Sequence, residues 1–231
     1  MLRSNQPEER VRARNHPVVA WALLAGGAIF FVGGGLHPKE DPPGVSLKEH
    51  LRVMYNDGNW YPGHALLFVG MALIAAALVA LVRSGALSGV RTTYVAGVVA
   101  AATASLGAVA AFLHLVMATE ADRIADGLGT PLTNLNLVVE TIVTPAFGLS
   151  IAALAVLGAR TGSIGNRTAA GLAVVGGTAW ALAGATFAFT DALNPLFPLA
   201  GLLGVWAIVT AVSLLRRTRT TDPASYALAN R

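Results

Sequence analysis

The sequence predicts an all-α fold, a bundle of six transmembrane helices in a polytopic membrane protein. The composition is the first observation: 55% of the 231 residues are hydrophobic, 12% are charged and the mean hydropathy is +0.61. An ordinary soluble domain carries about 25% charged residues. The apolar residues are also gathered in runs of roughly 18 to 25 residues without Lys or Arg, which is enough to cross about 30 Å of hydrocarbon. Finally, the basic residues alternate between successive connections.

Each apolar run is interpreted as one crossing of a transmembrane domain over residues 17–215. The first run follows a basic segment, as a secretory signal would. It is long, however, and lacks a small-x-small cleavage site before His37-Pro38, so we expect it to be retained as an anchor. The expected spans are residues 17–36, 61–83, 93–117, 133–158, 168–189 and 195–215.

The basic residues predict the orientation of the bundle. With six spans, twelve of the sixteen fall on one side, and a five-span model would move the C-terminal group to the other side. Because Lys and Arg are enriched in cytoplasmic segments, both termini (residues 1–16 and 216–231) are expected in the cytoplasm. The residues of this group are Arg3, Arg10, Arg12, Arg14, Arg83, Arg91, Arg160, Arg167, Arg216, Arg217, Arg219 and Arg231.

The location of the basic residues also indicates the class of partner. The pI near 10 is explained by arginines on the expected cytoplasmic side of the membrane, so the lipid bilayer is the expected partner and nucleic acid is not. The Ala- and Arg-rich composition favours the plasma (inner) membrane of a high-GC bacterium. No cysteine is present, which excludes disulfides and thiolate metal sites. No Walker or dinucleotide-binding motif is present either.

The outer loop at residues 37–60 is predicted to contain a short amphipathic helix at residues 46–57. Ser46 and Glu49 form a capping box at its start, and Asp57-Gly58 supplies its end. Such a helix would lie in the outer interface or cover the outer end of the bundle. Trp60, at the end of this loop, is expected to be an interface anchor.

Small residues recur every fourth position in two spans, which predicts close helix packing in lipid. The two rows are Gly97, Ala101 and Ser105 in the third span, and Gly177, Ala181 and Ala185 in the fifth.

Three ionisable side chains lie at similar depths inside three different spans. At 1.5 Å per residue, His64 lies roughly 6 Å beyond Trp60, His114 roughly 9 Å before the acidic segment at Glu120, and Glu140 roughly 10 Å beyond Thr133. Ionisable residues within the membrane are costly and usually face the bundle interior or a cavity. We therefore expect these three side chains to converge on a polar pocket in the outer third of the bilayer.

Two imidazoles and one carboxylate form the ligand set of catalytic Zn²⁺ and of non-haem iron sites. The predicted metal ligands are therefore His64, His114 and Glu140, with Glu140 also the candidate catalytic group. Asp191 and His37, which close the fifth and first spans, are candidates for the second shell. The competing cofactor is a haem with His64 and His114 as axial ligands.

Three classes of function fit this pocket. The first is a membrane-embedded enzyme, a metal-dependent hydrolase or oxidoreductase that acts on a lipid-like substrate. The second is a small proton-coupled transporter or binding protein that takes a small-molecule ligand from the outer side. The third is an accessory or assembly subunit of a larger membrane complex, with a structural polar layer. A homo-oligomer is compatible with each class.

Overall fold

The computed structural model describes residues 6–38, 53–184, 189 and 191–220, and every regular element within them is a helix. Six of these helices are long: α1 (Gln6–Leu36), α3 (Trp60–Arg83), α4 (Arg91–Val116), α6 (Pro131–Thr161), α7 (Arg167–Ala183) and α9 (Leu202–Thr220). Four short elements connect them: η1 (Met117–Glu120), α5 (Ala121–Ala125), η3 (Asp191–Leu196) and α8 (Phe197–Ala200). The predicted all-α fold is confirmed.

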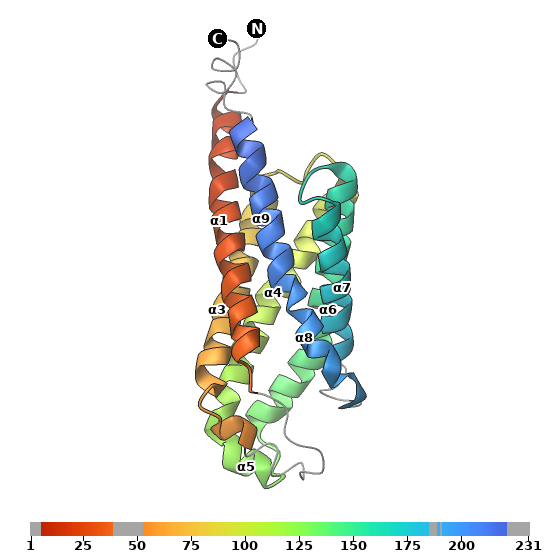
Figure 1. Cartoon of the computed structure of the whole chain (residues 1–231). Helices are drawn as coiled ribbons and strands as arrows, with labels where there is room; N and C mark the ends of the chain where they lie inside the picture. The colour runs from red at the N-terminus through yellow and green to blue at the C-terminus, as the bar shows by residue number, and fades with distance from the viewer. Residues whose placement is uncertain (1–5, 39–52, 185–188, 190, 221–231) are drawn as a thin grey trace.

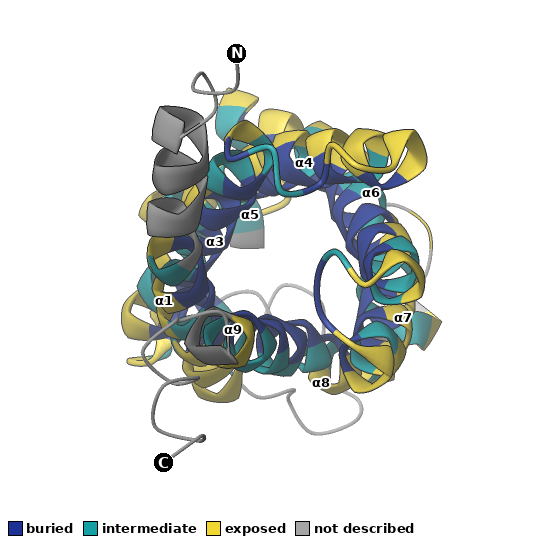
Figure 2. Ribbon diagram, turned by 90° about the horizontal axis from the view of Figure 1, so that it is seen from above, coloured by how far each residue is buried: buried dark blue, intermediate teal, exposed yellow. Residues whose placement is uncertain are grey.

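The long helices form a ring that follows the order of the chain. Each long helix packs against the one before and the one after it, and α9 closes the ring against α1. Viewed from above, the buried residues face into the ring and the exposed residues face outward (Figure 2). The start of α1 and the end of α9 lie at the same end of the bundle (Figure 1).

Among the residues that the structure describes, five segments are long and apolar enough to cross a membrane: Pro17–Leu36, Trp60–Arg83, Arg91–Ile124, Pro131–Thr161 and Phe197–Arg217. The fifth predicted span corresponds to α7, which has 17 residues, and residues 185–188 beyond it lie outside the described part of the chain. The number of crossings therefore stays a prediction.

Two element boundaries differ from those expected. Helix α1 begins at Gln6, well before residue 17, and runs through Pro17. The predicted last span begins at residue 195, but Pro195 lies in η3 and the chain passes through α8 before α9 begins at Leu202. Because proline lacks a backbone N–H, Pro195 and Pro198 cannot donate the helix hydrogen bonds that a single regular helix would need here. Of the predicted amphipathic helix, residues 53–56 are helical and residues 46–52 lie outside the described part.

Adjacent glycines allow α1 to approach two neighbours at once. A Cβ atom on Gly26 would lie 3.0 Å from the carbonyl oxygen of Gly70 in α3. A Cβ atom on Gly27 would lie 2.6 Å from the carbonyl oxygen of Gly204 in α9. Successive helix positions point about 100° apart, so this pair serves both contacts. Only glycine fits at such close backbone approaches.

Helix α7 uses the same arrangement. Gly176 lies against α9, where a Cβ atom would be 2.9 Å from the amide nitrogen of Leu203, and Gly177 lies against Gly148 of α6. Gly177 was predicted at a contact, and it is there. In the other predicted row, Ser105 is exposed and its hydroxyl donates to the Ala101 carbonyl oxygen of its own helix.

The end of the bundle opposite the chain termini is closed by side-chain contacts. The Thr130 hydroxyl accepts a hydrogen bond from the Thr133 amide as the N-cap of α6 and donates one to the Glu120 carboxylate. Tyr55, Trp60 and Met117 form a small buried cluster nearby. These contacts hold the starts of α3 and α6 against the end of α4, where the polar residues of the spans are found.

Candidate metal centre

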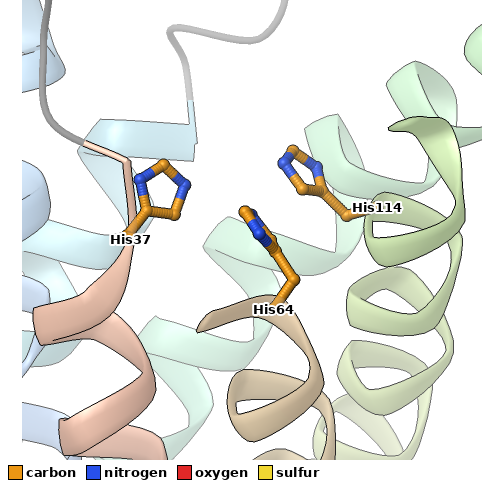
Figure 3. Close-up of side chains that lie close together, drawn as sticks. All are labelled: His37, His64 and His114. Carbon is orange, nitrogen blue, oxygen red and sulfur yellow. The ribbon is translucent and has the colours of Figure 1, made fainter. Parts of the chain in front are cut away.

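Three histidines from three segments meet at this closed end. His37 directly follows α1, His64 lies one turn into α3, and His114 lies in the last turn of α4. One ring nitrogen from each lies within 4.8 Å of the others. Figure 3 shows the three imidazole rings turned toward one another. The separation in sequence disappears because α1, α3 and α4 are consecutive members of the ring.

His64 is buried, with 3% of its surface exposed. Its Nδ1–H donates to the Trp60 carbonyl oxygen at 2.8 Å, one turn earlier in the helix. A carbonyl can only accept, so the proton is on Nδ1 and Nε2 carries a lone pair. Within the described part of the chain, Nε2 is buried and has no hydrogen-bond partner. A polar atom left in this state costs about 1–3 kcal/mol, which points to a ligand.

His114 is held by a carboxylate. Its Nδ1 lies 2.7 Å from Oε1 of Glu140 in α6. Glu140 is 6% exposed and Asn136, one turn earlier, is 3% exposed. The Asn136 amide nitrogen lies 3.5 Å from the same Nδ1, at the edge of the pair. A carboxylate on Nδ1 fixes the ring orientation and raises the basicity of Nε2, the arrangement found behind zinc-ligating histidines.

His37 completes the triad from the exposed side. Its Nδ1–H donates to the Pro38 carbonyl oxygen at 3.0 Å, and its ring centroid lies 4.7 Å from that of His64. Desolvation of the ring lowers the pKa of His37, and the charge of His114 acts in the same direction. Both effects favour the neutral imidazole, the form that binds a metal.

All three Nδ1 atoms thus face an oxygen acceptor: two backbone carbonyls and one carboxylate. With Nδ1 protonated in each ring, Nε2 is the nitrogen that carries the lone pair.

Aromatic rings form the wall of the site. Trp60 is fully buried and stacks on His64 with ring centroids 3.9 Å apart and on His114 at 5.3 Å. Its indole N–H donates to the Leu115 carbonyl oxygen at 3.2 Å. Tyr55 packs on its other side at 4.5 Å. Burial, with the charge of Glu140, raises the pKa of Tyr55 to about 12, so its phenol stays neutral.

The structure brings together most of the predicted site residues, but the contacts between them differ from those expected. His64, His114 and Glu140 lie side by side, as expected from their depths. Glu140 contacts His114 through Nδ1, and His37, expected in the second shell, lies in the triad itself. The side chain of Asp191 lies outside the described part of the chain.

Trp60 is the residue that sequence reasoning misplaced. It was expected at the membrane interface, but it is buried in the site. The available signal was its spacing, because residues four apart share a helix face and Trp60 precedes His64 by four.

The ring geometry also discriminates between cofactors. Axial ligands of a haem face each other head-on across the porphyrin plane. The rings of His64 and His114 are instead stacked, 24° apart in plane with centroids at 4.9 Å, which leaves no room for a porphyrin between them. The three ring nitrogens within 4.8 Å of one another could hold a single ion. No family model, curated protein or solved structure matches this chain.

Proposed function

We propose that this chain is a six-span protein of the bacterial plasma membrane that binds one Zn²⁺ ion through Nε2 of His37, His64 and His114. The observation that carries the proposal is the common state of the three rings, each with Nδ1 hydrogen-bonded to an oxygen acceptor. Three imidazoles with one open position are the donor set of a catalytic zinc site.

The distribution of charge supports an outer location for this site. Arg83 and Arg160 lie at the ends of α3 and α6, and Arg91 and Arg167 lie at the starts of α4 and α7. These helix termini are all at the end of the bundle away from the histidines. The histidine end carries mainly acidic residues: Asp57, Glu120, Asp122 and Asp126, with Arg123. By the positive-inside rule this distribution supports a cytoplasmic arginine end, with the triad near the outer surface.

The finer proposal is a hydrolase that acts on a lipid-like substrate in the outer interface. Zn²⁺ in such a site lowers the pKa of a bound water to about 7 and acts as a Lewis acid. The chain supplies the rest. Glu140 orients His114, Trp60 stacks on the rings of His64 and His114, and the exposed His37 marks the side from which a substrate would enter. Glu140 is then a positioning residue, since its carboxylate oxygen is engaged by His114.

Cobalt titration tests the proposal. Apo-protein in mild detergent should bind one equivalent of Co²⁺, with the intense visible d–d bands of a four-coordinate ion, and Zn²⁺ should displace it. The proposal is wrong if no saturable binding occurs, or if the bands have the low intensity of an octahedral ion bound at carboxylates.

Replacing Glu140 with glutamine should weaken Zn²⁺ binding about 10- to 100-fold, the usual effect of losing a carboxylate behind a ligating histidine. Glutamine keeps the size and leaves a neutral acceptor for His114 Nδ1–H. The measurement is the Zn²⁺ dissociation constant from competition with a chelator. Glu120→Gln is the matched control, because that carboxylate binds the Thr130 hydroxyl. Equal affinities for the two variants would contradict a role for Glu140.

A further inference from the structure

A groove of about 430 Å³ lies on the bundle surface between α4 and α6, at the arginine end. Its sides are apolar, formed by Val95, Val99 and Leu157, and the small side chains of Ala96 and Ala153 give it depth. Ser150 also lines it, but the Ser150 hydroxyl is bonded to Thr103 at 2.7 Å and to the Phe147 carbonyl oxygen. The groove thus presents hydrocarbon along its length.

One end of the groove is charged. Arg91 and Thr92 line it there, and both are exposed. Residues 58–119 and 141–190, which include all the residues that line the groove, contain no Asp or Glu. A guanidinium at the end of an apolar groove is complementary to an anionic head group attached to a hydrocarbon chain.

A phosphate suits this charged end, because it accepts bidentate hydrogen bonds from a guanidinium such as that of Arg91. At this end of the two helices, Thr93 of α4 and Thr161 of α6 approach each other with hydroxyl oxygens 3.5 Å apart.

The length of the groove restricts it to one leaflet. From Arg91 to Val99 the axis of α4 rises about 12 Å at 1.5 Å per residue, less than half of a hydrocarbon core of about 30 Å. Val95 and Val99 are 50% and 46% exposed, so the groove is open to the surrounding lipid along its side.

We propose that the groove between α4 and α6 is a binding site for one anionic phospholipid, with an acyl chain along Val95, Val99 and Leu157 and the phosphate at Arg91. The proposal rests on the membrane embedding proposed above and is independent of the metal centre at the other end.

Native mass spectrometry of the full chain tests the site. The protein is equilibrated with phosphatidylglycerol and phosphatidylcholine that carry the same acyl chains. One phosphatidylglycerol should be retained with a preference of about tenfold, the magnitude of a charge-assisted hydrogen bond. Arg91→Gln should remove the preference, and Ala153→Phe, which fills the groove, should reduce retention of both lipids.

The matched control is Arg83→Gln, an exposed arginine at the same end that does not line the groove. It should leave the preference unchanged. An equal loss in Arg83→Gln and Arg91→Gln, full retention in Ala153→Phe, or displacement of the lipid by inorganic phosphate alone would each overturn the proposal. The helical circular-dichroism spectrum checks the fold of every variant. Failure of Co²⁺ binding at the triad in the wild-type protein would count against the metal site only.

Discussion

Replacing His64 with alanine should reduce Zn²⁺ binding from one equivalent to background. A structural zinc site contributes about 10–16 kcal/mol through four ligands. One ligand is therefore worth roughly 3 kcal/mol, or more than a hundredfold in affinity. His64 is the ligand with the largest expected effect because it is buried and its Nε2 has no partner in the described part of the chain. The measurement is zinc content after equilibration at a fixed free concentration.

A second variant separates loss of the site from loss of the fold. His64→Phe keeps the stacked ring against Trp60 and removes the unpartnered nitrogen. The apo-form of this variant should unfold at the same temperature as the wild-type apo-protein or higher, because burying an unsatisfied polar atom costs about 1–3 kcal/mol. It should nevertheless bind no zinc. If His64 lowers the stability of the apo-protein and is required for zinc binding, its role is to bind the ion.

The control is His16→Ala, because residue 16 is 21 positions from His37 along the chain, near the other end of α1. It should leave zinc content at one equivalent. Zinc retained by both His64→Ala and His64→Phe would show that the ion binds elsewhere, and the histidine triad would lose its proposed role.

The sequence was sufficient for the class of fold because hydrocarbon imposes simple rules. Apolar runs of sufficient length can only be helices there, and the depth of each ionisable residue follows from counting along the helix. His64, His114 and Glu140 could be predicted to share a layer for this reason. Helix ends were less predictable. The start of α9 depends on how Pro195 and Pro198 divide η3 from α8, which is a local balance of turn geometries.

The relations within the site could not be predicted, because depth says nothing about rotation around a helix axis. Whether Glu140 faces a metal or the Nδ1 of His114 depends on how α6 packs on α4, and that contact is set by side chains distributed along both helices. His37 was placed at the boundary of its span by counting, but its position against His64 depends on the close contact between α1 and α3 that Gly26 and Gly70 permit.

The same substitution at two glycines of α7 should have opposite effects on stability. At Gly177 an added methyl group would overlap the carbonyl oxygen of Gly148 and lie 3.4 Å from the Cβ atom of Ala152, so α6 and α7 would have to move apart. Overpacking of this kind costs about 1–3 kcal/mol. At Gly171, near the start of α7, nothing lies within 4 Å of the added atom, and the higher helix propensity of alanine should stabilise by about 0.5–1 kcal/mol.

The measurement is the free energy of unfolding in mixed detergent micelles for Gly177→Ala, Gly177→Leu and Gly171→Ala. We expect Gly177→Leu to be the least stable, because its longer side chain adds atoms where a Cβ atom already overlaps the Gly148 backbone. The consequence should reach the metal centre. Helix α6 carries Glu140 on the face toward α4, so a displaced α6 draws the carboxylate away from His114. Weaker zinc binding in Gly177→Ala with unchanged binding in Gly171→Ala would show that the contact between Gly177 and Gly148 positions the site. Equal stability of the two alanine variants would show that α6 and α7 do not pack closely at these glycines.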